Sequence, residues 1–252
     1  MPALKHELFP REMIVYLPPQ YEAGGERRFP VLYMHDGQNL FDPETSFIPG
    51  TYWRMGETAD ELIEAGAIEP LIIVGIYNAG AKRNEEYTPP GADAYGRLLV
   101  EELKPFIDAH YRTAPEHCGM GGSSLGGWVT LYLGLRYPTV FSQLAVMSPS
   151  IWWGKRIILR IVTALQTKPG SRIWLDIGTK ESTRSVPDAR ALRDGLIRKG
   201  WVLGEDLAYF EADGAAHSES AWAERVAPML RFLYPALSHS GTAQVVEDGH
   251  RG

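Results

Sequence analysis

Short apolar runs rich in Val, Ile and Tyr alternate with amphipathic stretches of helical length along most of this chain. Such runs are typical of buried parallel strands, and the stretches between them are long enough to cross back over a sheet. The alternation predicts an α/β fold, with a mostly parallel central sheet flanked by helices on both faces. Strands are expected at 13–18, 29–36, 70–78, 117–121, 141–148, 172–178 and 207–212. Helices are expected at 53–66, 94–111, 125–138, 189–200 and 219–234, with Pro105 kinking the second helix or delaying its start.

The composition of the 252 residues narrows the class of protein. A net charge of −6 with no basic block argues against nucleic acid and against an anionic membrane as partners. Because neither a secretory signal nor an apolar run of membrane-spanning length is visible, a cytoplasmic protein outside the membrane is expected. Cys118 is the single cysteine, which excludes an internal disulfide. Without repeats or Ser/Gly linkers, residues 1–237 are expected to form one domain and residues 238–252 a flexible tail.

Five glycines and two serines fall in the stretch GMGGSSLGGW, which follows an expected strand and opens an expected helix. A nucleophile elbow needs the frame G-x-S-x-G at such a turn, because glycines let the backbone cross itself beneath the exposed serine. Ser124 fits this frame, since Gly122 and Gly126 flank it. Ser123 does not fit, because Leu125 occupies its second flanking position. We therefore predict Ser124 as a nucleophile and Ser123 as a small residue that permits close packing.

A serine hydroxyl is a weak nucleophile until a neighbouring base accepts its proton, and that base is usually histidine. His239 and His250 lie in the expected tail, where no fixed geometry is expected. His217 lies in FEADGAAHSESAW, between an expected strand and the last expected helix. The loops at the carboxyl ends of parallel strands gather at one edge of the sheet, where ligands bind. His217 is therefore the predicted base.

The carboxylate that orients this histidine should follow the strand RIWLDIG. Asp176 lies within the strand, where a carboxylate is more often a structural hydrogen-bond acceptor. Asp188 follows a proline in SVPDARAL, which is typical of a charge in the first turn of a helix. Glu181 lies in the loop directly after the strand. We favour Glu181 as the acid, with Asp188 second and Asp176 third.

An oxyanion hole would combine two backbone amides. The first belongs to Leu125, the residue after the predicted nucleophile. The second is expected in the loop HDGQNLFD after the strand at 29–36, where Gly37 permits an unusual backbone and Gln38 presents its N–H. The alternative for this loop is an ordinary Asp-Gly turn.

Aromatic residues follow two of the expected strands and are predicted to bind the substrate. Trp152 and Trp153 lie in SPSIWWG, and Trp53 follows the HDGQNLFD loop. Their rings could line a site for an acyl chain, an aryl acid or a sugar, or could instead pack the protein's own loops. Lys82 or Arg83 could contact a negatively charged substrate, although a solvated surface is the simpler interpretation.

These segments together resemble the putative-esterase branch of the α/β-hydrolases over most of the chain, from about residue 12 to residue 235. That branch includes enterochelin esterases, S-formylglutathione hydrolases, feruloyl and acetyl-xylan esterases, and mycolyltransferases. The most specific carriers are VLYMHDGQNLFD, GMGGSSLGGWVTLYLGLRYPTVF and DGAAHSESAWAER. The resemblance implies an α/β-hydrolase fold and carboxylic-ester chemistry. Matched by motif, it implies Ser124 as nucleophile, His217 as base, Glu181 as acid, and the Gln38 and Leu125 amides as oxyanion hole.

The expected function is hydrolysis of a small-molecule carboxylic ester through an acyl-enzyme. An acyltransferase with the same triad, in which an acceptor alcohol replaces water, is the first alternative. A non-catalytic binding protein on this fold is the second, and it is disfavoured because the triad is complete. No metal and no cofactor are expected, since no zinc-protease helix, paired-cysteine or phosphate-loop pattern occurs. The oligomeric state stays open.

Overall fold

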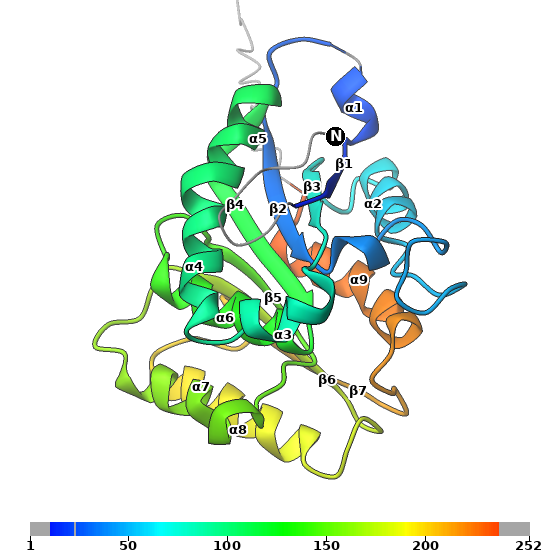
Figure 1. The fold of residues 1–252 in the computed structure, drawn as a ribbon. Helices are drawn as coiled ribbons and strands as arrows, with labels where there is room; N and C mark the ends of the chain where they lie inside the picture. Colours follow the sequence, from blue (N-terminus) through cyan, green and yellow to red (C-terminus); the bar gives the residue numbers. More distant parts are fainter. Residues whose placement is uncertain (1–10, 23, 237–252) are drawn as a thin grey trace, which may run out of the picture.

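The computed structural model describes residues 11–22 and 24–236. Within them, a seven-stranded sheet has the order β1-β3-β2-β4-β5-β6-β7 (Figure 1). Strand β1 (Met13–Tyr16) runs antiparallel to β3 (Ile72–Ile76), and all other neighbours are parallel. The remaining strands are β2 (Phe29–His35), β4 (Thr113–Ser123), β5 (Gln143–Met147), β6 (Arg172–Gly178) and β7 (Leu207–Ala212). The predicted mostly parallel sheet is confirmed.

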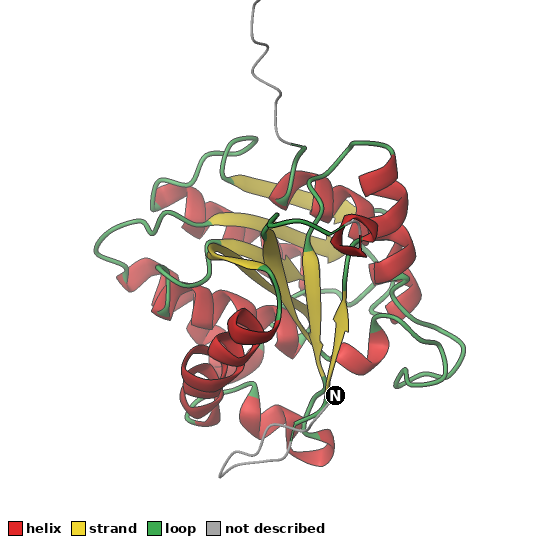
Figure 2. Cartoon of the chain, turned by 90° about the horizontal axis from the view of Figure 1, so that it is seen from above, coloured by secondary structure: helices red, strands yellow, loops and turns green. Residues whose placement is uncertain are grey.

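Helices cover both faces of this sheet, as the view from above makes plain (Figure 2). The first face packs against α4 (Gly91–Arg97), the π-helical stretch Leu98–Leu103, α5 (Lys104–His110), α6 (Leu125–Arg136), α7 (Trp153–Ala164) and α8 (Ser185–Arg198). The second face packs against α2 (Met55–Glu64) and α9 (Glu219–Leu233). Shorter elements are α1 (Pro19–Glu22), α3 (Arg83–Glu86) and the 3-10 turns Gly37–Asn39 and Gly80–Lys82. In the described part of the chain, no helix is long and apolar enough to cross a membrane.

The pleat of β2 illustrates why this strand is apolar throughout. Val31 and Tyr33 belong to the core on the first face, whereas Leu32 and Met34 belong to the core on the second. Successive side chains of a strand point to opposite faces, so a strand covered on both sides has no solvent-facing position. The burial of β2 on both faces is therefore consistent with its position inside the sheet, between two neighbouring strands.

Several elements differ from the sequence-based expectation, among them the helix expected at 94–111 and helix α7. The helix expected at 94–111 contains a π-helical stretch just before Pro105, and the Lys104 amide bonds to the Leu99 carbonyl five residues back. A proline ring would meet a carbonyl in a regular helix, and the wider turn relieves that conflict. Helix α7 was not anticipated, yet its apolar residues Ile158 and Val162 lie four apart and pack into the core.

Candidate active site

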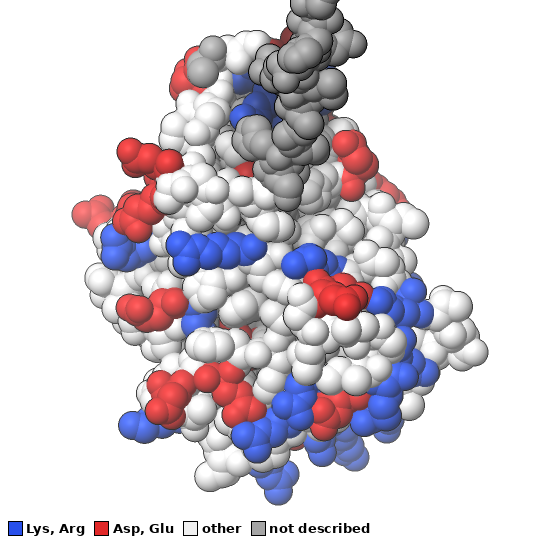
Figure 3. Space-filling view, turned by 180° about the vertical axis from the view of Figure 1, so that it is seen from behind, with Lys and Arg blue, Asp and Glu red and all other residues white. Residues whose placement is uncertain are grey.

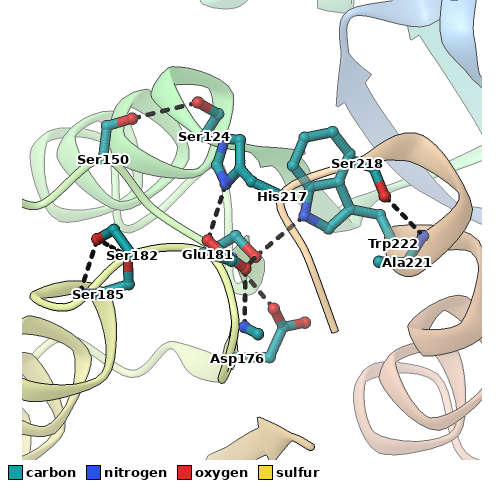
Figure 4. Close-up of polar contacts among 12 residues, drawn as sticks. Ser124, Ser150, Asp176, Glu181, Ser182, Ser185, His217, Ser218, Ala221 and Trp222 are labelled. Carbon is teal, nitrogen blue, oxygen red and sulfur yellow. Dashed lines mark hydrogen bonds and ion pairs between the residues drawn. The ribbon is translucent and has the colours of Figure 1, made fainter. Parts of the chain in front are cut away.

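Ser124 lies in a sharp turn between β4 and α6, at the carboxyl edge of the sheet. Its backbone has φ 59° and ψ −123°, a conformation that a residue with a side chain rarely adopts. The Ser124 amide donates to the Met147 carbonyl at 3.1 Å, which anchors the turn to β5. The Ser124 hydroxyl lies 3.2 Å from the Ser150 hydroxyl (Figure 4). The turn therefore projects a serine hydroxyl from a constrained backbone.

The glycines around Ser124 allow the strand and the helix to approach closely. A Cβ added at Gly122 would lie 3.0 Å from the backbone carbon of Gly126 and 3.1 Å from the His35 Cβ. A Cβ added at Gly126 would lie 3.2 Å from a carboxylate oxygen of Asp36. The two glycines of the G-x-S-x-G frame thus face each other where the chain crosses itself.

His217 and Glu181 come together beside Ser124, although 36 residues separate them in sequence. The His217 Nδ1 lies 2.8 Å from the Glu181 Oε2, and the imidazole lies between Ser124 and Glu181 (Figure 4). The His217 ring also meets the Trp222 ring edge to face, with centroids 4.8 Å apart. When Nδ1–H donates to the carboxylate, Nε2 is the nitrogen free to accept a proton.

Hydrogen bonds tie together the loops that carry these two residues. The amides of Thr179 and Lys180, in the loop after β6, donate to the carbonyls of Ala212 and Ala215 at 3.0 Å each. In return, the Gly214 amide donates to the Thr179 hydroxyl at 2.8 Å. The spacing between Glu181 and His217 is therefore supported by hydrogen bonds between their loops, in addition to the hydrogen bond between the two side chains.

A buried polar network lies behind Glu181. Its Oε1 accepts hydrogen bonds from the Ser148 hydroxyl at 2.5 Å and from the Gly178 amide at 2.7 Å. Ser148 in turn accepts from the Trp222 indole N–H at 3.0 Å and from Arg225 at 3.2 Å. Burial on its own would raise the pKa of the Glu181 carboxyl, but the hydrogen bonds from His217, Ser148 and Gly178 hold that pKa below its usual range. Glu181 is thus kept as a carboxylate.

The other two candidate acids have different partners. Asp176 is fully buried in β6, where it accepts hydrogen bonds from Arg225 at 2.7 Å and from the Trp174 indole N–H at 2.7 Å. Burial raises the pKa of Asp176 to about 6, although the Arg225 charge opposes the shift. Asp188 lies in the first turn of α8 and pairs with Arg156 at 2.9 Å. Of the three, Glu181 is the one bonded to His217.

The loop after β2 passes very close to β3. A Cβ added at Gly37 would lie 2.3 Å from the carbonyl carbon of Gly75, so only glycine fits at this crossing. Asp36 precedes it with a left-handed φ of 58° and is held by a two-pronged pair with Arg83, at 2.6 and 2.7 Å. Arg83 therefore helps to hold this loop in place. From the sequence, Arg83 is interpreted as a solvated surface residue or a contact of a negatively charged substrate.

The Gln38 amide lies in the 3-10 turn Gly37–Asn39, and the Leu125 amide is the first of helix α6, directly after Ser124. Neither N–H bonds to a backbone carbonyl among the described residues. Amides at the start of a helix lack an acceptor within the helix and can serve an external oxygen. Gln38 and Ser124 line one and the same cavity, whose walls include Asp36, Phe47, Ile48 and Trp222.

Two cavities meet at Ser124 and His217. The first is the one on the Gln38 side. The second lies on the side of α7 and α8 and is lined by Ser124, Ser148, Pro149, Ser150, Ile151, Trp152, Glu181, Ser182, Arg184, Ser185, Asp188 and His217. An ester held at Ser124 would have room on either side of its reacting carbon.

The three tryptophans predicted to bind substrate occupy different environments. Trp152 is 66% exposed and lines the second cavity. Trp53 is 2% exposed and packs on Trp222, and Trp153 packs against Trp128 inside the core cluster. Because their rings are used in packing, Trp53 and Trp153 line neither cavity, and substrate contact stays a prediction for Trp152 alone.

Some of the sequence-based predictions concern residues that the structure does not describe, and one residue of the site was not predicted. His239 and His250 and the tail at 238–252 lie outside the described residues. Arg225 was missed, although a charge at a core position of α9, three residues after Trp222, is a signal that a buried partner exists. Among the described residues, no group of three or more His, Cys, Asp or Glu could hold a metal ion.

The sheet order, the elbow and the two-sided helical cover define an α/β-hydrolase-like protein. The family model Esterase, described as "Putative esterase", matches residues 9–233. The chain therefore belongs to the Esterase family, and it is an ester hydrolase.

Individual relatives agree with this assignment. The chain is 26% identical to the uncharacterized protein YbbA of Bacillus subtilis over 91% of this chain and 95% of that one. It is 28% identical to the ferri-bacillibactin esterase BesA of the same organism over 52% of this chain and 51% of that one. The crystal structure of the enterobactin esterase FES from Shigella flexneri has a TM-score of 0.74 and 22% identity, covering 92% of this chain and 59% of that one. This structural likeness supports the fold alone.

Proposed function

We propose that this enzyme hydrolyses small-molecule carboxylic esters through an acyl-enzyme on Ser124, with His217 as base and Glu181 as the acid that orients it. The observation that carries the proposal is the contact of His217 Nδ1 with Glu181 Oε2 at 2.8 Å, beside a serine on a strained strand-to-helix turn. The proposal is supported by the position of these three residues at the carboxyl edge of the sheet, where such folds bind ligands.

In the first half of the reaction, the Ser124 Oγ attacks the ester carbonyl carbon as His217 Nε2 takes its proton. The hydroxyl first exchanges its Ser150 partner for His217 by rotation about the Cα–Cβ bond. The N–H groups of Gln38 and Leu125 stabilise the negative oxygen of the tetrahedral intermediate. When the intermediate collapses, the carbonyl–alkoxy bond breaks and the departing alcohol receives the proton from His217. Ser124 is left acylated.

In the second half, water replaces the alcohol. His217 removes a proton from the water, which attacks the acyl carbon through a second tetrahedral intermediate. Collapse releases the carboxylic acid and returns the proton to Ser124. The lowered pKa of Glu181 keeps a negative charge beside His217 throughout, which stabilises the imidazolium formed in each half.

The experiment that tests this scheme is partitioning of the acyl group between water and methanol. We expect the ratio of acetic acid to methyl acetate to be the same for 4-nitrophenyl acetate and phenyl acetate, because both give one acetyl-enzyme. Stopped-flow release of 4-nitrophenol should show a burst if deacylation is slower than acylation. A ratio that changes with the leaving group would contradict a common acyl-enzyme.

The Gly37 position offers a test of the proposed oxyanion loop. We expect Gly37→Ala to lower kcat by about 10²- to 10³-fold, as loss of an oxyanion donor does. Overpacking at the Gly75 contact should also lower the free energy of unfolding by about 1–3 kcal/mol. Gly170→Ala is the matched control, since a Cβ there meets nothing within 4 Å. Ester turnover and urea unfolding of both variants would be measured; wild-type kcat in Gly37→Ala would exclude this loop from the hole.

A further inference from the structure

Positive charge is concentrated in one part of this acidic protein. Residues 150–200 contain eleven Lys or Arg and four Asp or Glu, a net charge of +7, whereas the whole chain carries −6. This segment includes α7 and α8, and blue side chains gather on that side of the molecule, at the lower right of Figure 3. Residues of this segment, among them Trp152, Arg184 and Asp188, form one wall of the candidate active site.

The backbone that begins α7 is strained at the point where it presents two of these charges. Gly154, Lys155 and Arg156 are three consecutive left-handed residues, with φ of 56°, 55° and 61°. Such a conformation is unfavourable for residues with side chains, and strain of this kind is concentrated at binding and catalytic sites. Only Trp153 separates Trp152 from this turn, and the side chains of Trp152, Lys155 and Arg156 line one cavity.

These residues line a cavity that continues the second active-site cavity. Its walls are Trp152, Lys155, Arg156, Arg184, Pro187 and Asp188. Trp152, Arg184 and Asp188 also line the cavity that contains Ser124 and His217. The two cavities are therefore adjacent, and a substrate bound at Ser124 that extends past Trp152 would approach the basic side chains.

The charges in this cavity are only partly neutralised. Arg156 pairs with Asp188 at 2.9 Å. Lys155 and Arg184 are exposed and have no carboxylate partner within the described part of the chain. Two uncompensated cations thus lie beside the exposed Trp152 ring, a combination that suits an oxyanion attached to an apolar or aromatic body.

The cavity on the other side of Ser124 has polar walls, with Asp36, Asn78 and Glu219 among them, and an apolar lip. Its lip carries Phe47 and Ile48, which are 80% and 46% exposed. The cation on its wall, Arg83, is already paired with Asp36. The candidate site therefore has an apolar lip on one side of the nucleophile and a basic lip on the other.

We propose that the substrate is an anionic ester whose carboxylate, or an oxyanion of similar geometry, binds Lys155 and Arg184 beside Trp152. The remainder of the substrate extends past Ser124 toward Phe47. This inference rests on the proposed function, because the basic cavity selects among esters only if the ester reacts at Ser124.

Matched pairs of esters test the proposal. In the first pair the charge is on the acyl part: 4-nitrophenyl hydrogen glutarate against its neutral methyl ester. In the second pair the charge is on the alcohol part: 4-acetoxybenzoate against methyl 4-acetoxybenzoate. We expect kcat/KM for the anionic member of at least one pair to exceed that of its neutral partner about tenfold, since each exposed ion pair contributes modestly. The pair that shows the preference identifies which part of the ester lies in the basic cavity.

Variants then locate the preference. Lys155→Gln combined with Arg184→Gln should abolish this preference, by lowering kcat/KM for the anionic ester to about that of its neutral partner. Arg160→Gln is the control, because Arg160 is an exposed arginine of the same helix that lines neither cavity. Equal rates for both members of both pairs in the wild type would overturn the inference, as would a preference that survives in the double variant. Absence of Ser124-dependent turnover of the neutral esters would instead overturn the proposed function.

Discussion

Replacement of Ser124 by alanine is expected to lower kcat for 4-nitrophenyl acetate by about 10⁴- to 10⁶-fold, which is the scale of losing the nucleophile in a serine hydrolase. Without the hydroxyl no acyl-enzyme forms, and the remaining rate comes from the oxyanion donors and from binding. Alanine keeps the Cβ, so the positive φ at this position costs the same in the variant. The free energy of unfolding should therefore stay close to that of the wild type.

Ser123→Ala is the matched control for this experiment. Ser123 is the neighbouring serine, is buried and lines the cavity on the Gln38 side. It occupies the first variable position of the G-x-S-x-G frame and not the position of the nucleophile, so its loss should leave kcat near the wild-type value. Steady-state rates, intact-protein mass after a rapid acid quench, and urea unfolding would be compared for both variants. If Ser123→Ala lost the acyl adduct and Ser124→Ala kept it, the nucleophile would be Ser123 and the assignment to Ser124 would be wrong.

The sequence was sufficient for the sheet and for the turn that carries Ser124, because both depend on local signals. Alternating apolar runs specify buried strands, and the spacing of Gly122 and Gly126 around Ser124 specifies the crossing of strand and helix. The contact of His217 with Glu181 was expected from the placement of both after neighbouring strands of a parallel sheet.

Contacts that depend on tertiary packing were not accessible in the same way. Ser148 donates a hydrogen bond to Glu181 and accepts hydrogen bonds from Trp222 and Arg225. These residues come from the ends of β5 and β6 and from α9, and no local sequence pattern encodes how these elements are oriented. Trp53 and Trp153 share composition and loop position with Trp152, but packing against other rings decides which of the three stays exposed. The left-handed turn before α7 is equally hidden, because two of its three residues carry side chains that disfavour it.

Replacement of Glu181 by glutamine is expected to lower kcat by about 10³- to 10⁴-fold, while Asp188→Asn should have little effect on kcat. The reason lies in the two oxygens of Glu181. Oε1 accepts hydrogen bonds from Ser148 and Gly178, so the amide oxygen of the glutamine should take that position. Its NH₂ group then faces His217 Nδ1, where the wild type has an acceptor.

A donor facing Nδ1 favours the tautomer of His217 that carries its proton on Nε2, and this nitrogen can then no longer accept the proton of Ser124. Because the pKa of Glu181 lies below its usual range, the wild type keeps the carboxylate at neutral pH, and the deficit of Glu181→Gln should persist between about pH 6 and 9. Asp176→Asn controls for damage to the buried network. It weakens the ion pair with Arg225, so it should lower the free energy of unfolding while kcat changes little. If Asp188→Asn lost far more rate than Glu181→Gln across this pH range, the acid would have to be reassigned to Asp188.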